Sequence, residues 1–223
     1  MSFFYDGVDC AEIHDLHEKG ILRGITTNLT LVNNQKKNLK ITRAEVINPI
    51  VDLAVKYDIP ISVQLESNTI SEMIVEGEKL YKDYSNVSKF FVKVPIDFEK
   101  LKVVSKLSSM GVKINATCIT STSQAQMATT AGASIVSFFW GKMSDQGINP
   151  FHHVSEYSKW KYRNDFQKVL TLVGSIRQIS TIYSAFEAGS DVVTTGYLNW
   201  KKYTDQLLSS DANSIFQETN ITN

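Results

Sequence analysis

The chain has 223 residues, of which 43% are hydrophobic, enough for one sizeable core. Its 23 Lys and Arg residues balance 23 Asp and Glu residues, so the net charge gives no electrostatic basis for binding nucleic acid or an anionic membrane. The sequence has no apolar run of about 18 residues, and no basic region followed by an apolar stretch opens it. We therefore expect a cytoplasmic protein without a membrane span or a secretion signal.

Short runs rich in β-branched and aromatic residues alternate with amphipathic runs along the chain. The former predict strands at residues 3–6, 24–28, 61–66, 90–96, 113–119, 134–140, 170–176 and 191–196. The latter predict helices at residues 9–19, 42–57, 68–84, 97–111, 121–132, 154–166, a segment ending at 189, and 199–208. A polar loop through Lys36 and Lys37 and a longer loop at 141–152 separate some of these elements. Pro49 predicts either a kink in its helix or a second start capped by Asn48.

Eight strand–helix units without a linker favour a parallel sheet, and this number favours closure into a (β/α)₈ TIM barrel. The rival is an open doubly wound sheet, which favours a glycine-rich turn after the first strand. Residues 6–9 (Asp-Gly-Val-Asp) do not have that pattern. We expect a single-domain α/β barrel over residues 1–208 and a short polar tail over residues 209–223.

The cysteines and histidines do not indicate a metal site. Cys10 and Cys118 lie far apart in the sequence, which is typical of two reduced thiols. His14 and His17 share a helix face that would suit a metal, but no third ligand cluster accompanies them. We expect these histidines to be solvated and the protein to need no metal or other cofactor.

Lys93 is the one charged residue in the apolar strand 90–96. A lysine in such a strand either faces solvent or is desolvated, with a lowered pKa that suits Schiff-base formation with a carbonyl compound. Alternation along the strand places Phe91, Lys93 and Pro95 on one face and Val92 and Val94 on the other. The local sequence favours solvent exposure of Lys93. The choice between the two alternatives therefore depends on residues elsewhere in the chain.

In a barrel of this kind, the carboxyl ends of the strands form the active site. Polar residues occur late in nearly every predicted strand: Asp6, Asn28, Gln64, Lys93, Thr117, Ser137, Ser175 and Thr195. Because these polar residues converge around one lysine, a catalytic role for Lys93 is favoured over solvent exposure. Phe91 and Val94 would then form the apolar wall that keeps water away from its amine. Asp6 is then the candidate proton carrier, and Asn28 would orient substrate hydroxyls. Gln64 and Thr117 would hold the water that carries protons.

Loops after the late strands of barrels often bind phosphate. Ser175 and Arg177, after the seventh strand, offer a hydroxyl and a bidentate cation, and Lys142, after the sixth, adds a second charge. Each alone would be typical of a surface salt bridge. Together at one mouth they indicate phosphate binding.

At this point the sequence resembles the transaldolases, in particular the short subfamily that includes fructose-6-phosphate aldolase. The resemblance runs from Phe3 to about Thr195. It rests on Tyr5-Asp6, Gly24-Ile25-Thr26-Thr27-Asn28, Val92-Lys93-Val94-Pro95, Asn115-Ala116-Thr117, Ala131-Gly132-Ala133, the 137–142 run Ser-Phe-Phe-Trp-Gly-Lys, and Gly174-Ser175-Ile176-Arg177.

This resemblance implies an enzyme that forms a Schiff base on Lys93, splits a ketose phosphate between C3 and C4, and holds dihydroxyacetone. Transaldolases pass that unit to an aldose phosphate, whereas the aldolases release it. Asp6, Asn28 and Thr117 resemble the family's acid/base, its orienting amide and its water-holding threonine. The residues that we expect to contact sugar phosphates are Thr26, Ser137, Phe139, Lys142, Ser175 and Arg177.

Two positions depart from the family pattern, and two others discriminate between its reactions. Leu29 replaces the usual proline, and Lys142 replaces a phosphate-binding arginine. Phe139 matches transaldolases and lacks the tyrosine hydroxyl of the aldolases, whereas Gln64 matches the aldolases. Because no hydroxyl at position 139 would help to protonate the enamine, we expect transfer. Aldol cleavage and a non-catalytic barrel remain as alternatives. The resemblance also implies a ring-shaped homo-oligomer, a pentamer or a decamer, with the tail contacting a neighbouring subunit.

Overall fold

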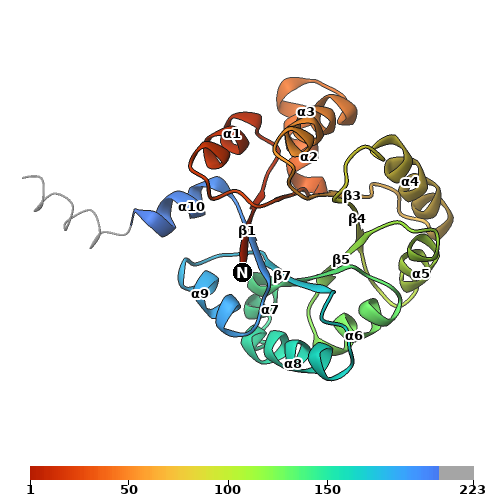
Figure 1. Ribbon diagram of the computed structural model, residues 1–223, viewed down its shortest axis with the longest axis vertical. Coiled ribbons are helices and arrows are strands. Elements are labelled where there is room, and N and C mark those ends of the chain that lie inside the picture. The colour runs from red at the N-terminus through yellow and green to blue at the C-terminus, as the bar shows by residue number, and fades with distance from the viewer. Residues whose placement is uncertain (206–223) are drawn as a thin grey trace, which may run out of the picture.

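The computed structural model describes residues 1–205 and contains a closed barrel of eight parallel strands, each paired with its neighbours in chain order (Figure 1). The strands are β1 (Ser2–Asp6), β2 (Ile25–Thr26), β3 (Ile61–Gln64), β4 (Phe90–Pro95), β5 (Ile114–Ile119), β6 (Ile135–Phe139), β7 (Leu170–Gly174) and β8 (Val192–Thr195). Pairing of β8 with β1 closes the ring. The predicted single-domain (β/α)₈ barrel is confirmed.

Helices surround this barrel on its outer side (Figure 1). Within residues 1–205 they are α1 (Cys10–Glu18), α2 (Leu29–Leu39), α3 (Arg43–Lys56), α4 (Ile70–Asp83), α5 (Leu101–Ser109), α6 (Thr122–Thr130), α7 (Trp140–Asp145), α8 (Pro150–Arg163), α9 (Ser180–Glu187) and α10 (Tyr197–Thr204). No helix in this part of the chain is both long and apolar enough to cross a membrane. The expected tail contact at residues 209–223 lies outside the described residues and stays a prediction.

The prediction of two long loops, one through Lys36 and Lys37 and one at 141–152, was wrong in part. Residues 29–39 form α2, which Asn28 caps by accepting a hydrogen bond from the Leu31 amide. Only Val32 of α2 is buried, so the helix has little apolar periodicity to predict it. Residues 140–145 form α7, and α3 continues through Pro49 without a second start.

The floor of the barrel interior is apolar. It is formed by Phe4, Ile135, Leu172 and Val192, with Phe91 and Leu170 packed against them. Two positions further along these strands come four polar residues: Asp6, Lys93, Ser137 and Thr194. Because side chains alternate along a strand, each pair shares the interior face. The apolar floor therefore supports a polar level that leads to the mouth.

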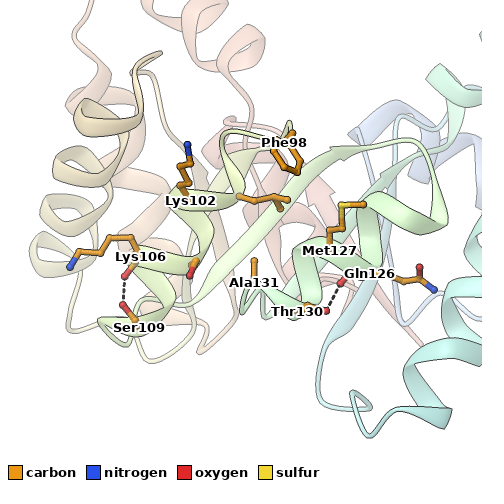
Figure 2. Close-up of a pocket in the computed structure, with 10 residues that line it drawn as sticks. Phe98, Lys102, Lys106, Ser109, Gln126, Met127, Thr130 and Ala131 are labelled. Atoms are coloured by element: carbon orange, nitrogen blue, oxygen red, sulfur yellow. Dashed lines mark hydrogen bonds between the residues drawn. The ribbon is translucent and has the colours of Figure 1, made fainter.

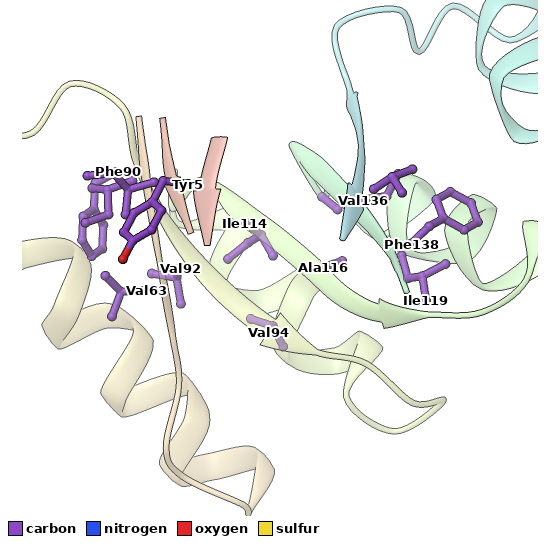
Figure 3. Packing of buried hydrophobic residues seen from close by; sticks show 14 of the residues in the cluster. Tyr5, Val63, Phe90, Val92, Val94, Ile114, Ala116, Ile119, Val136 and Phe138 are labelled. Atoms are coloured by element: carbon purple, nitrogen blue, oxygen red, sulfur yellow. The ribbon is translucent and has the colours of Figure 1, made fainter. Parts of the chain in front are cut away.

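A second apolar cluster fills the space between the barrel and its helices (Figure 3). Val92 and Val94 of β4 belong to this outer cluster. The prediction that Val94 forms a wall beside Lys93 was therefore wrong, because alternation turns Val94 away from the interior. Phe91, which packs on the floor cluster, lies on the same face as Lys93.

Candidate active site

Lys93 lies in the middle of β4, paired in register with Gln64 of β3 and Asn115 of β5. Only 5% of the residue is exposed, so the solvent-facing alternative is contradicted. Its Nζ donates a hydrogen bond to the Thr27 carbonyl oxygen at 2.9 Å. Burial lowers the pKa of the Lys93 amine, and the negative charge of Asp6 opposes this shift only in part. The site therefore stabilises the neutral, nucleophilic form of the amine relative to the same amine in water.

Asp6, the last residue of β1, is held by groups from the neighbouring strand. Thr26 Oγ1 donates a hydrogen bond to Asp6 Oδ1 at 3.0 Å, and Asn28 Nδ2 lies 3.4 and 3.5 Å from the two carboxylate oxygens. The Asn28 side chain is itself oriented, because its Oδ1 caps α2. Thr26 and Asn28 thus both face the carboxylate, although Asn28 was expected to face substrate.

Thr117 has a buried hydroxyl with no hydrogen-bond partner among the described residues. Its neighbour Cys118 has a φ of 64°, at a register shift where β5 departs from β6. An orphaned buried hydroxyl is costly unless a water or a ligand completes it. Thr117 lies beside Pro95 in register, two residues beyond Lys93, so a group bound there would adjoin the amine.

Gln64 ends β3 with a half-buried side chain next to Lys93 in register. Arg43 Nη2, from the start of α3, donates to the Gln64 carbonyl oxygen. Arg43 also binds Glu76 of α4, whose carboxylate accepts the amide hydrogens of Glu66 and Ser67. This clamp fixes the end of β3, and its main contacts join residues too distant in sequence for a local motif to reveal.

A chain of hydrogen bonds crosses the interior below the mouth. Ser137 Oγ donates to Asn115 Oδ1 at 2.6 Å, and Asn115 Nδ2 donates to Ser62 Oγ at 3.1 Å. All three side chains are buried. Neither Ser62 nor Asn115 was among the predicted site residues, although strand alternation places each two positions before one that was. Ser137 is thus tied to the interior network.

The prediction that the Thr195 side chain of β8 faces the barrel mouth was wrong. Thr194, not Thr195, faces the barrel interior, where its hydroxyl lies 2.7 Å from Thr26 Oγ1. The Thr195 hydroxyl instead accepts a hydrogen bond from Asn199 of α10. A run of four buried residues gives no polar alternation from which the phase could be inferred.

Of the expected phosphate-binding residues, Lys142 lies in α7, which directly follows β6, and Ser175 and Arg177 lie on the loop after β7. The Gly141 amide donates to the Ser175 carbonyl oxygen at 2.9 Å, and a Cβ at Gly141 would lie 2.8 Å from Arg177 side-chain atoms. Ser175 has a φ of 59°, in the left-handed region. Arg177 pairs with Asp145 at 2.7 Å, and Lys142 is exposed. Two cations therefore stand at one side of the mouth, one of them already paired with a carboxylate.

Two surface cavities lie at different distances from the barrel mouth. A groove of about 840 Å³ runs between α5 and α6 on the outer surface, with Phe98 and Met127 along it (Figure 2). A smaller cavity of about 360 Å³ reaches Asp6 and is lined by Asn34 of α2 and Asn199 of α10. We assign the chemistry to the mouth because the buried lysine and carboxylate lie there.

No group of three or more His, Cys, Asp and Glu side chains within residues 1–205 is arranged to hold a metal ion. Cys10 and Cys118 are free thiols. His17 stacks on Tyr57 with ring centroids 3.6 Å apart, and His14 Nδ1 lies 2.6 Å from the Tyr57 hydroxyl. These histidines therefore pack against α3.

Comparison with known proteins gives a consistent family. Residues 3–222 match the model of the family described as Transaldolase/Fructose-6-phosphate aldolase. The chain is similar to a probable transaldolase of Clostridium botulinum, with 36% identity over 197 residues, 88% of this chain and 86% of the relative. A probable transaldolase of Streptococcus pyogenes is 30% identical over 218 residues, 98% of this chain and 97% of the relative.

Among solved structures, the chain is similar in fold to one with little sequence identity. It is a cube-shaped, highly porous protein cage designed by fusing symmetric oligomeric domains, with a TM-score of 0.58 at 10% identity. The match covers 98% of this chain and 77% of the other.

Proposed function

Because the chain belongs to the transaldolase/fructose-6-phosphate aldolase family, we propose that it is a Schiff-base transaldolase. It would transfer a dihydroxyacetone unit from a ketose phosphate, such as fructose 6-phosphate, to an aldose phosphate. The observation that carries this proposal is the buried amine of Lys93 at the barrel mouth, where burial lowers its pKa. A neutral amine is what attack on a carbonyl carbon requires.

The proposed reaction begins when Lys93 Nζ attacks C2 of the ketose. The resulting carbinolamine takes up a proton, loses water and becomes a protonated imine, whose nitrogen accepts the electron pair of the bond that breaks next. The C3–C4 bond then breaks as Asp6 takes the proton of the C4 hydroxyl, the aldose phosphate leaves, and an enamine of dihydroxyacetone stays on Lys93. The enamine attacks the aldehyde carbon of the acceptor, and Asp6 returns the proton to the new hydroxyl. Water then releases the product from Lys93.

The surrounding groups fit the supporting roles of this scheme. The unpartnered Thr117 hydroxyl and the Gln64 side chain would hold the water that leaves and re-enters at the imine carbon. Asn28 would bind a substrate hydroxyl through its amide hydrogens while it keeps Asp6 oriented. Thr26, Ser137 and Phe139 would complete the lining of the sugar site. Among the described residues, the amide of Asn28 and the hydroxyl of Thr117 are thus two polar groups that would remain available to substrate or water.

Phosphate would bind at Ser175, Arg177 and Lys142. Arg177 can exchange its exposed partner Asp145 for a phosphate because exposed ion pairs are weak. Lys142 supplies a point charge where the family has a planar guanidinium, so we expect weaker and less directional phosphate binding than an arginine would give. Arg177 therefore carries the directional part of phosphate recognition.

Trapping with borohydride tests this function. After incubation with fructose 6-phosphate and reduction, mass spectrometry should find one reduced dihydroxyacetone unit on Lys93. Lys93→Met should lose the adduct and all transfer to erythrose 4-phosphate while retaining its fold. A folded wild-type protein without the adduct contradicts the proposal and favours the non-catalytic barrel.

Aldol cleavage is the second candidate, and Gln64 is the residue that favours it. This reading requires release of free dihydroxyacetone from fructose 6-phosphate when no acceptor is present. Phe139→Tyr places a hydroxyl at the mouth that can help to protonate the enamine. We predict that this variant releases free dihydroxyacetone at least several-fold faster than wild type, and that Phe139→Leu does not. An equal release rate in all three proteins contradicts this role of position 139.

We further propose that the protein forms a pentamer or decamer, as the family resemblance implies. Light scattering coupled to size-exclusion chromatography measures this directly, and a monomeric mass contradicts it.

A further inference from the structure

Thr194 is a buried hydroxyl residue on β8 whose only hydrogen-bond partner among the described residues is another hydroxyl. Its Oγ1 lies 2.7 Å from Thr26 Oγ1 on β2. The two strands flank β1, which carries Asp6, so the pair spans the interior in front of β1. Thr194 is 4% exposed and Thr26 is fully buried, so both depend on protein partners.

Counting protons fixes the direction of these hydrogen bonds. A threonine hydroxyl has one proton to donate, and an ionised carboxylate can only accept. Because Thr26 donates to Asp6 Oδ1 at 3.0 Å, its oxygen has to accept the proton of Thr194. The reverse direction would leave the Thr194 proton without an acceptor in the described part of the chain. The Thr194 proton therefore points to Thr26 Oγ1, and the Thr26 proton points to Asp6 Oδ1.

We propose that Thr194 is a positioning residue, which acts through Thr26 to keep Asp6 Oδ1 occupied as an acceptor. The proton that Asp6 takes from the substrate is then exchanged at Oδ2, the oxygen that the threonine pair leaves open. Neighbouring hydrogen bonds polarise one another, so the Thr194 bond also strengthens that of Thr26. This inference rests on the proposed function, because it assigns Thr194 to the proton transfer of that reaction.

Removal of the Thr194 hydroxyl tests the inference. Thr194→Val keeps the side-chain shape, whereas Thr194→Ser keeps the hydroxyl. Because Thr194 is proposed to act through Thr26 and not on the substrate, Thr194→Val should form the borohydride-trapped Lys93 adduct with an unchanged KM but lower kcat for transfer about tenfold, a fraction of what a general acid–base group contributes. Thr194→Ser should retain a kcat close to wild type. If Thr194→Val does not fold, Thr194→Ala replaces it.

A matched control separates catalysis from packing. Thr129 is a buried threonine whose hydroxyl bonds to Tyr157, outside the barrel, so Thr129→Val should leave kcat unchanged. A double-mutant cycle gives a readout that a packing effect alone would not change. Once Thr26→Val has removed the hydrogen bond from Thr26 to Asp6, adding Thr194→Val should lower kcat no further.

The outcomes are distinguishable. A wild-type protein that forms no Lys93 adduct overturns both the proposed function and this inference. A normal adduct with full kcat in Thr194→Val overturns only the role of Thr194. Equal losses in Thr194→Ser and Thr194→Val, or additive losses with Thr26→Val, assign the effect to packing and overturn it as well.

Discussion

Lys93 places an amine where water does not reach, and this burial affects reactivity and folding in opposite ways. In the unfolded chain the amine binds its proton up to its ordinary pKa of 10.5, whereas burial lowers the pKa in the folded protein. Between these two values the unfolded state binds more protons, so stability rises with pH. At neutral pH, Lys93 therefore destabilises the fold that makes it reactive.

We predict that Lys93→Met is inactive yet more stable than wild type. Methionine fills a similar volume without a group that has to be desolvated, and such replacements stabilise by about 1 kcal/mol or more. Its Tm at pH 7 should rise by a few degrees, measured by circular dichroism. The difference should shrink as the pH approaches 10.5, and a lower Tm for the variant contradicts the assignment of desolvation as the dominant effect.

The pH dependence of adduct formation gives a second residue-scale prediction. Only the neutral amine attacks C2, so the initial rate should rise with pH through the folded pKa of Lys93 and level off well below pH 10.5. Lys93→Met, which has no amine at this position, provides the background rate at each pH. A rate that is still rising at pH 10.5 would show that Lys93 is not activated.

At the scale of elements, the clamp between α3 and α4 holds the end of β3. Burial alone would raise the pKa of Glu76, but the amide hydrogens of Glu66 and Ser67 and the Arg43 guanidinium hold it below its usual value. The ionised carboxylate therefore stabilises the fold above the unfolded pKa of about 4.5, and this stability is lost as pH falls through the lower folded value.

Glu76→Gln should cost about 2 kcal/mol at pH 7, because it leaves the partly buried Arg43 with the more distant Glu66 carboxylate, 3.6 Å away, as its counter-charge. Urea unfolding should show this deficit at pH 7 and a smaller one near pH 3, because below about pH 4.5 the unfolded wild-type chain binds a proton at Glu76 and part of its stabilising effect is lost. Transfer activity should also fall several-fold, since the Gln64 backbone is less firmly held. Glu78→Gln on the exposed side of the same helix is the control, and an equal cost in both variants would contradict the clamp.

The sequence predicts the elements whose signal is local. The eight strands are runs of apolar residues, and the Thr42–Glu45 capping box starts α3 as predicted. α2 escapes prediction because its apolar periodicity is weak and only Val32 is buried, and α7 because its six residues are too few for a periodic pattern. The exposure of Lys93 could not be predicted from β4 alone, since alternation is the same whether its face meets solvent or a barrel interior. The Arg43 clamp joins residues 21 and 33 positions apart, which no local motif reveals.

At the scale of the whole molecule, the barrel is closed where the chain's first strand meets its last. Ser2 donates its amide hydrogen to the Asp191 carbonyl oxygen, just before β8. The Asp191 carboxylate accepts the Thr171 amide at 2.8 Å and forms an ion pair with Lys161 of α8 at 2.5 Å. Lys161 also donates to the carbonyl oxygen of Val169. One carboxylate thus links α8, β7 and the closing edge, opposite the catalytic mouth.

The two partners of this ion pair are buried to different extents, and this predicts unequal costs for removing them. The Lys161 side chain is 1% exposed, whereas that of Asp191 is 35% exposed. Asp191→Asn leaves a buried ammonium without a counter-charge and should cost about 3 kcal/mol. Lys161→Met leaves a carboxylate that keeps the Thr171 amide and reaches water, and should cost about 1 kcal/mol.

Urea unfolding at pH 7 measures both costs. Lys159→Met, which breaks the exposed pair with Glu156 on the same helix, is the control and should be close to neutral. Because the pair lies at the end of the barrel away from Lys93, neither variant should change the KM of the folded enzyme. A cost for Lys161→Met equal to or above that for Asp191→Asn would mean that the carboxylate, not the ammonium, is the group that depends on its partner, and that the closing edge is held by Lys161 rather than by Asp191.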